Sequence, residues 1–487
     1  MINKETNKTA KNRDILFVYT NINGSHSDTY SFGIGYLSSV LKENGFKTAL
    51  VVVKSKRDYK NVLKAVLEYK PRIVGFTAVS SQFVFISDLA RMIKNTHDCI
   101  TVCGGVHPTI FPDCINYAPH LDGVFRGECE YSFLDFASSV VSGKGYKDVD
   151  NFCYLDNGRL VKNKLRPRIV NIETLPFPDR DIYDYQSIIN ANDGMATIMS
   201  SRGCPFSCTY CCNHAIARVY GEERNVIRHN SIERSLAEID ILRSKYRFDK
   251  LWFIDDLFVF NRQWLDEFLL EYKKNFSIPF ICQIRPNICS RDMLLKLKDA
   301  GCYKIFVAIE STNDYIRNAV MKRNITKQQI EDTFAWAKEA GLETLSSNII
   351  GVPGETEETV LEAIDFNRRM NPTAIGVNIF SPYEGTVLGD YCHEKGFVRK
   401  VDARLFSDRK QSRLLLPTIK NDILMRLYDS FNYLVYKETN PARARQILIN
   451  RYFKKLENVF LLGALFRRLK KTRTVKVIRE KILRRTG

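Results

Sequence analysis

Residues 14–142 alternate between short apolar runs and stretches in which hydrophobic positions have helical spacing. A short apolar run bounded by polar or glycine residues is typical of a strand that is buried on both faces. Because strands alternate with helices, we expect a doubly wound parallel sheet, whose ligands bind beyond the carboxyl ends of the strands. The expected strands are residues 15–19, 48–53, 73–79, 99–105 and 123–127, and the expected helices are residues 33–44, 62–69, 85–95 and 131–141.

Residues 143–195 lose this alternation. Their segment NFCYLDNGRLV contains an Asn-Gly turn, which predicts a β-hairpin. Pro176 and Pro178 then interrupt any regular element. We interpret these residues as a linker.

The alternation resumes after residue 195, with six apolar runs of strand type separated by helical stretches. The runs are ATIMSS, KLWFID, PFICQI, KIFVAIE, TLSSNII and AIGVNIF. Six βα units predict a partial parallel (β/α)6 barrel, and the active sites of parallel barrels lie at the carboxyl ends of the strands. The predicted organisation is a disordered lead-in (1–13), a doubly wound domain (14–142), a linker (143–195), a partial barrel (196–396) and a basic helical region (397–487).

Composition supports a folded protein of several domains. A length of 487 residues suits two or three domains, and a hydrophobic content of 45% is ample for packed cores. No apolar run approaches the ~20 residues needed to span a bilayer, and the polar N-terminal residues do not resemble a secretory signal. We therefore expect a cytoplasmic protein.

The net charge of +18 is concentrated near the end of the chain, where residues 441–487 hold fifteen Lys or Arg against two Glu. The apolar run VFLLGALF lies within this basic region. One interpretation is an amphipathic helix packed on the barrel, with its charged face in solvent. The alternatives are peripheral contact with an anionic membrane and, less favoured, binding to nucleic acid.

Four of the thirteen cysteines cluster in SSRGCPFSCTYCCN, directly after the first barrel run. Cys204, Cys208 and Cys211 have the spacing C-x3-C-x2-C, and thiolates are the ligands of iron–sulfur clusters. Three ligands on one loop leave one iron of a four-iron cube open to another molecule. A structural zinc site, the alternative, usually takes four ligands. We do not expect the adjacent Cys212 to be a ligand, and His214 is a weaker candidate for a fourth position.

This segment resembles the cysteine motif of the radical S-adenosylmethionine (SAM) superfamily, C-x3-C-x-aromatic-C, with Tyr210 as the aromatic residue. The resemblance implies a partial (β/α)6 barrel, a [4Fe–4S] cluster on the three cysteines, and SAM bound at the open iron with Tyr210 near its adenine. It also implies that an electron, supplied by a flavodoxin- or ferredoxin-type donor, cleaves SAM to methionine and a 5′-deoxyadenosyl radical.

The same resemblance suggests further SAM-binding residues at the ends of the barrel strands. Many members carry Gly-Gly-Glu after the second strand, where this chain has Asp255-Asp256, so that a carboxylate is retained in a different pattern. Glycines after the fifth strand would let the backbone approach the adenine. Arg285 and Arg323 are candidates to bind a carboxylate or the substrate. The candidates at later strand ends are Glu310, Ser311, Gly351 and Gly354.

The first domain resembles the cobalamin-binding domain of B12-dependent radical SAM enzymes, a flavodoxin-like fold. The segments FTAVSS, CGGVHPTIFP and FRGECEYSF carry this resemblance. The expected cobalamin-binding residues are Thr77, Ser80, Gly104, Gly105, His107, Gly127 and Glu128. The cobalt-binding pattern Asp-x-His-x-x-Gly is absent after the first strand, so we expect cobalamin to bind without a histidine ligand from the protein. The alternative is a flavodoxin-like module that binds no cofactor.

The resemblance as a whole implies an enzyme that resembles the class B radical SAM methyltransferases and transfers a methyl group through cobalamin to an unactivated carbon. A related enzyme that cyclises, contracts a ring or oxidises without net methyl transfer is the alternative. A methylthiotransferase acting on tRNA is disfavoured, because neither extra N-terminal cluster cysteines nor an RNA-binding barrel is visible. We expect a small-molecule or lipid-like substrate, whose identity the sequence does not name.

Overall fold

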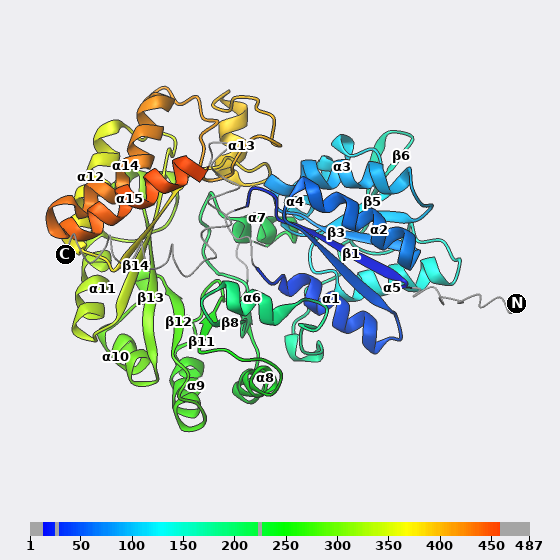
Figure 1. Ribbon diagram of the computed structural model, residues 1–487, viewed down its shortest axis with the longest axis horizontal. Coiled ribbons are helices and arrows are strands. Elements are labelled where there is room, and N and C mark those ends of the chain that lie inside the picture. The colour runs from blue at the N-terminus through cyan, green and yellow to red at the C-terminus, as the bar shows by residue number, and fades with distance from the viewer. Residues whose placement is uncertain (1–12, 25–28, 223–225, 458–487) are drawn as a thin grey trace, which may run out of the picture.

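The computed structural model describes residues 13–24, 29–222 and 226–457. Residues 1–12 of the predicted lead-in and residues 458–487 of the basic region, including VFLLGALF, lie outside the described residues. Figure 1 shows two sheets side by side, the first in blue and cyan and the second in green and yellow. Within the described residues, no helix is both long and apolar enough to cross a membrane.

The first sheet has seven strands in the order β2-β1-β3-β4-β5-β6-β7, and β1 to β5 are parallel. Helices α1 and α5 cover one face, where their apolar side chains form one core, and α2 and α3 pack with a second core on the other face. The strands are β1 (Ile15–Thr20), β2 (Thr48–Val53), β3 (Ile73–Thr77), β4 (Ile100–Gly104), β5 (Gly123–Phe125), β6 (Phe152–Asp156) and β7 (Arg159–Lys162). The helices are α1 (Phe32–Glu43), α2 (Tyr59–Tyr69), α3 (Phe83–Lys94), α4 (Val106–Ile110) and α5 (Glu130–Val141).

The predicted hairpin is confirmed, and it extends the first sheet. Strand β6 pairs antiparallel with β5, and β7 pairs antiparallel with β6. Asn157 and Gly158 both have positive φ at the turn, as a two-residue hairpin loop requires. Phe152 is fully buried in the first core, so this part of the predicted linker packs as a component of the first sheet.

The second sheet confirms the six predicted barrel strands. Its order is β15-β14-β13-β12-β11-β8, and every neighbouring pair is parallel. The sheet is not closed, because β8 and β15 are its two edges. The strands are β8 (Met195–Ile198), β11 (Lys250–Phe253), β12 (Phe280–Ile284), β13 (Cys302–Glu310), β14 (Glu343–Ile350) and β15 (Ala374–Ile379). The helices are α6 (Tyr185–Ala191), α7 (Cys212–Val219), α8 (Ile232–Lys245), α9 (Arg262–Asn275), α10 (Arg291–Asp299), α11 (Lys327–Glu339), α12 (Glu357–Met370) and α13 (Val387–Glu394).

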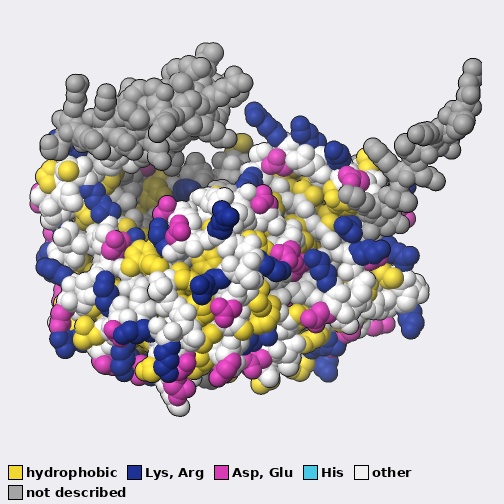
Figure 2. Space-filling view, turned by 60° about the horizontal axis from the view of Figure 1, so that its bottom comes forward, with side chains coloured by type: hydrophobic (Ala, Val, Ile, Leu, Met, Phe, Trp, Pro, Cys, Tyr) yellow, Lys and Arg dark blue, Asp and Glu magenta, His cyan; other side chains and the backbone are white. Residues whose placement is uncertain are grey.

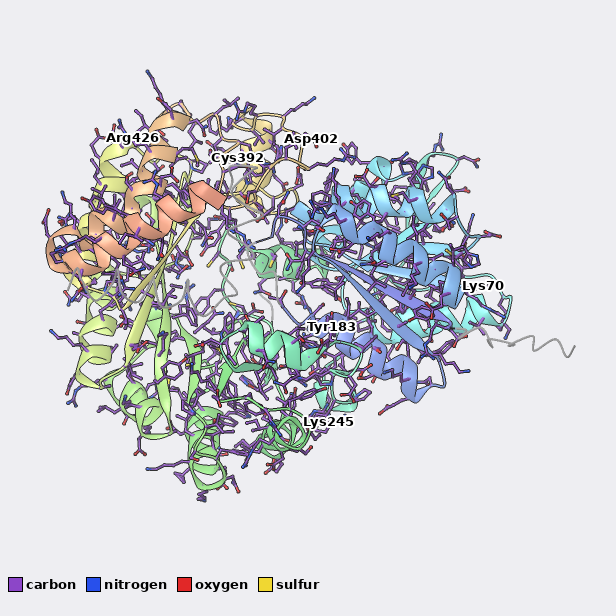
Figure 3. All side chains as sticks on the ribbon, viewed as in Figure 1. Lys70, Tyr183, Lys245, Cys392, Asp402 and Arg426 are labelled. Carbon is purple, nitrogen blue, oxygen red and sulfur yellow. The ribbon has the colours of Figure 1, made fainter. Side chains whose placement is uncertain are left out.

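Helices α14 (Asn421–Thr439) and α15 (Pro441–Glu457) confirm a helical region near the end of the chain. The predicted helical region also includes residues 397–420, but these residues are irregular. In this segment Leu414 and Leu416 are both buried at a spacing of two, which suits an extended backbone. This segment reaches the first domain, where Arg404 donates two hydrogen bonds to Asp88 on α3. Figure 3 shows Asp402 of the same segment near that domain.

Charges of both signs are mixed over the described surface. On the face shown in Figure 2, Lys and Arg side chains are interspersed with Asp and Glu. This mixing agrees with a charge excess that lies mainly in residues 441–487.

Candidate functional site

The three predicted cluster cysteines lie on the loop between β9 (Ser201–Arg202) and α7. Strand β9 pairs with β10 (Arg228–His229), and Gly203 takes a positive φ of 102° where the loop turns. Thr209 connects this loop to the segment after β13. Its N–H donates to the carbonyl of Met321, and its hydroxyl donates to the carbonyl of Val320. The loop conformation therefore depends on contacts far away in the sequence.

The three predicted cluster cysteines differ in how far they are buried. Cys208 is buried, while Cys204 and Cys211 are partly exposed. Burial raises the pKa of Cys204 to about 12, so that metal binding at this thiol releases a proton. No group of three or more His, Cys, Asp or Glu side chains among the described residues is close enough to hold one metal ion. A four-iron cube differs from a mononuclear zinc site in that it takes each thiolate on a different iron.

Two buried arginines lie beside the loop. Arg285 Nη1 is 3.6 Å from Cys208 Sγ, and its guanidinium lies 3.7 Å from the ring centroid of Phe206. Arg323 Nη1 donates to the hydroxyl of Tyr210 at 2.6 Å. Both arginine side chains are more than nine-tenths buried, so neither is a surface ion-pair partner. The positive charges of the two arginines therefore lie next to the cysteine loop, where deprotonated cysteines would be negatively charged.

Glu310, at the end of β13, lies close to Arg323 and has a left-handed backbone conformation. Its φ is +64°, and the pairing of β13 with β14 shifts between Ala308 and Glu310. Such a bulge re-aims a side chain at the end of a strand. The Glu310 carboxylate lies 3.8 Å from Arg323 Nη1, and burial raises its pKa. The neighbouring Ser311 is buried, and its carbonyl accepts a hydrogen bond from Arg317.

The two adjacent aspartates have different environments. Asp255 is 1% exposed and accepts hydrogen bonds from the N–H and hydroxyl of Ser200 and from the hydroxyl of Ser201 at 2.5 Å. Burial raises the pKa of Asp255 to about 6. Asp256 is exposed and lines a cavity next to the loop. Of the two predicted carboxylates, Asp256 is therefore the one that faces the cavity.

The two predicted glycines after β14 differ, and Gly351 is the one that packs against a C-terminal helix. Gly351 has a φ of +83°, and a Cβ there would lie 2.8 Å from a methyl of Leu424 on α14. Its N–H donates to the buried carboxyl of Glu355, which also accepts from the N–H of Val352 at 3.3 Å. Gly354 has a φ of +88° in an exposed turn.

One cavity of about 430 Å³ joins the first domain to the cysteine loop. Gly105 has a φ of +98°, and a Cβ there would lie 2.7 Å from Thr77 Oγ1, so glycine is required for this close approach. Five predicted cobalamin-binding residues line the cavity: Thr77, Gly104, Gly105, Gly127 and Glu128. From the other side it is lined by Arg202, Gly203, Cys212, Asn213 and Asp256.

The other two predicted cobalamin-binding residues lie elsewhere. Ser80 and His107 line a separate cavity of about 810 Å³, between the first domain and the segment after β15. His107 Nδ1 and Ser80 Oγ are 2.9 Å apart, and the His107 ring packs between Phe83 and Phe111. Burial lowers the pKa of His107 to about 4, so the ring is neutral at pH 7. The structure does not bring these two residues into the cavity that the other five share.

Two buried ion pairs connect the halves of the shared cavity, and sequence reasoning did not identify them. Glu128 pairs with Arg228 of β10 at 2.5 Å, and Glu130 pairs with Arg202 of β9 at 2.7 Å. Tyr220 adds a contact, because its hydroxyl accepts from the N–H of Glu128 at 2.8 Å. Residues 127–130 therefore bind the β9-β10 pair, and the cysteine loop begins directly after β9.

Comparison with known proteins agrees with this architecture. Residues 20–137 match the family model of the B12 binding domain, and residues 198–366 match that of the radical SAM superfamily. The chain is 29% identical over 362 residues to an uncharacterised methyltransferase of Pyrococcus horikoshii, covering 74% of this chain and 77% of that one. It is 24% identical over 386 residues to an anaerobic magnesium-protoporphyrin IX monomethyl ester cyclase of Rubrivivax gelatinosus, covering 76% and 68%. The solved structure of the cobalamin-dependent SAM radical enzyme OxsB with aqua-cobalamin bound shares the fold, with a TM-score of 0.68, 17% identity, and coverage of 97% and 75%.

Glu355 predicts a pH dependence of stability. Because burial raises its pKa to about 8 from 4.5, the folded state favours the protonated carboxyl. Its contribution to stability is complete below pH 4.5 and is lost as the pH rises through about 8. In Glu355→Gln we expect a flatter dependence of Tm on pH across this range, measured by thermal unfolding. The exposed Glu358→Gln is the control, and an unchanged pH profile in Glu355→Gln would contradict the assignment.

The Glu128–Arg228 pair predicts a stability effect. Glu128→Gln leaves the Arg228 charge buried without a counter-charge, so we expect a loss of about 3 kcal/mol or more in the free energy of unfolding. The double variant Glu128→Gln/Arg228→Met should lose less unfolding free energy than the sum of the losses in the two single variants. Urea denaturation measures all three variants. Asp135→Asn removes an exposed pair and should change stability by less than about 1 kcal/mol. Equal effects of Glu128→Gln and Asp135→Asn would refute the buried role.

Proposed function

The chain belongs to the radical SAM enzymes that carry a B12-binding domain, and we propose that it transfers a methyl group from SAM, through cobalamin, to an unactivated carbon. The observation that carries this proposal is the shared cavity, which is lined both by the glycines at the carboxyl edge of the first sheet and by residues of the cysteine loop. A small-molecule or lipid-like substrate is proposed to bind between these two edges. When bound, the cluster would supply the electron that cleaves SAM, and cobalamin would carry the methyl group.

The loop residues are proposed to hold the cluster. Cys204, Cys208 and Cys211 would provide three thiolates, and the guanidiniums of Arg285 and Arg323 would offset their charge. The hydrogen bond from Arg323 orients the Tyr210 ring at the loop, where we propose that it packs against the adenine of SAM. Asp256 is proposed to accept hydrogen bonds from the SAM amino group, because its carboxylate faces the cavity.

The carboxyl edge of the first sheet is proposed to hold cobalamin. Gly104 and Gly105 let the backbone lie against a large flat ligand, and Thr77 adds a hydroxyl beside them. None of the described residues that line the cavity is a histidine. We propose that cobalamin bound in this cavity receives no histidine ligand from its lining.

A second candidate is a reaction without net methyl transfer, such as a cyclisation. It is favoured by the similarity to the Rubrivivax cyclase, which covers 76% of the chain. Both candidates need the same cluster and cavity, and both are proposed to receive an electron from a flavodoxin- or ferredoxin-type protein. They differ in the fate of the SAM methyl group, which an isotope experiment measures directly.

Labelled SAM tests methyl transfer. The anaerobically reconstituted protein, with cobalamin and a reductant, is incubated with deuterated-methyl SAM and an extract of small molecules and lipids. We expect deoxyadenosine together with a product that has gained a labelled methyl group, detected by mass spectrometry. Deoxyadenosine formed with no labelled product would exclude methyl transfer and favour the cyclase-type reaction.

The cysteines can be tested by cluster content. We expect Cys204→Ala to lose the brown chromophore and most of its iron after anaerobic reconstitution, because each cluster thiolate binds its own iron. Cys212→Ala is the matched control, because Cys212 is adjacent in sequence and lines the cavity next to the loop. Iron analysis and visible absorbance measure both variants. Retention of the cluster in Cys204→Ala, or equal loss in Cys212→Ala, would refute the proposed ligand set.

A further inference from the structure

The shared cavity has two chemically different parts. Between the sheet and helices α1 and α5 it is lined by apolar side chains, including Phe17, Val102 and Phe133. Gly75 leaves space there, because a Cβ would lie 3.2 Å from the ring of Phe17. Near the carboxyl edge of the sheet, the lining is instead charged, and besides Asp256 and the ion pairs of Arg202 and Arg228 it includes Arg168. The cavity of about 430 Å³ is within the ~300–1,000 Å³ typical of small-molecule sites.

Contacts with Glu222 and Tyr220 hold the Arg168 guanidinium in place, while its Nη2 has no hydrogen-bond acceptor among the described residues. Its side chain is only 9% exposed. Nε lies 3.1 Å from both carboxylate oxygens of Glu222, and the guanidinium lies 4.0 Å from the ring centroid of Tyr220. Nη2 is buried and donates no hydrogen bond within the described residues. A buried donor without an acceptor is costly, so this atom is placed where a ligand can supply one.

We propose that Arg168 binds the phosphodiester of the cobalamin nucleotide tail. This inference rests on the proposed function, because it assumes that cobalamin occupies the cavity. The tail joins a flat aromatic base to a single negative charge, and the cavity offers an apolar slot together with a buried guanidinium. Guanidinium groups bind phosphate oxygens with charge-assisted hydrogen bonds, and the Glu222 pair fixes the orientation of the fork before the ligand arrives.

Other anions could also meet Arg168, and the test separates them. The SAM carboxylate would use the same guanidinium but would not depend on the nucleotide tail. A corrinoid series distinguishes the two, because cobinamide lacks the phosphate and base, cobinamide phosphate adds the phosphate, and cobalamin has both.

The experiment measures corrinoid binding to the full-length chain by titration of the corrin absorbance spectrum. We expect the wild-type protein to bind cobinamide phosphate about 10-fold to 100-fold more tightly than cobinamide, as a hydrogen bond between charged groups provides. Arg168→Ala should abolish this preference and leave cobinamide binding unchanged. Arg168→Lys keeps a charge without the fork and should retain an intermediate preference.

Two further variants distinguish a general disturbance of the fold from the loss of a direct contact between Arg168 and the phosphate. Arg166→Ala removes an arginine two positions away that pairs with Asp135 and does not line the cavity, so the preference should remain. Glu222→Gln keeps Arg168 but weakens the pair that orients its guanidinium, so it should retain a reduced preference. A full preference in Arg168→Ala, or an equal loss in Arg166→Ala, would overturn the inference. Wild-type protein that binds no corrinoid would instead refute the proposed function itself.

Discussion

Two buried ion pairs between the segment after β5 and the β9-β10 hairpin constrain the rest of the site. Replacing such a pair by apolar residues is often neutral for stability, but breaking it leaves a buried charge and is costly. The main effect of these pairs is therefore to fix how β9 and β10 lie against the first sheet, and their contribution to the free energy of unfolding is secondary. Because Arg202 directly precedes Gly203 and Cys204, its pairing with Glu130 fixes where the cysteine loop begins relative to the first sheet.

The two ion pairs bring together the carboxyl edges of the two sheets, which belong to separate domains. Parallel strands collect their following loops at one edge, so each sheet alone presents a binding edge. The ion pairs bring the glycine-rich edge of the first sheet and the cysteine loop of the second to one cavity. Side chains at Gly105 or Gly127 would fill it or collide with its walls, since a Cβ at Gly127 would lie 2.2 Å from the Tyr220 hydroxyl.

Features set by local sequence could be predicted, and those set by distant contacts could not. Buried parallel strands are recognisable as continuous apolar runs, and the cysteine spacing is local. Arg168 lies in a stretch without regular pattern, and its role depends on Glu222 and on cavity walls from other elements. His107 was grouped with the glycines because it is close to them in sequence, yet the chain after Gly105 turns it toward a different cavity. Even the adjacent Asp255 and Asp256 differ, because Asp255 is hydrogen-bonded to Ser200 and Ser201 while Asp256 lines the cavity, and neither set of contacts is local in the sequence.

The charge balance at the cysteine loop gives the last argument for what the loop receives. Arg285 and Arg323 bring two positive charges into the protein beside Cys208 and Tyr210. Glu310 lies 3.8 Å from Arg323, and burial raises the pKa of the Glu310 carboxyl. Burying cations without counter-charge is expensive. Three thiolates bound to iron, as proposed for the cysteine loop, would supply that negative charge, which is a physical reason for the proposed ligand set.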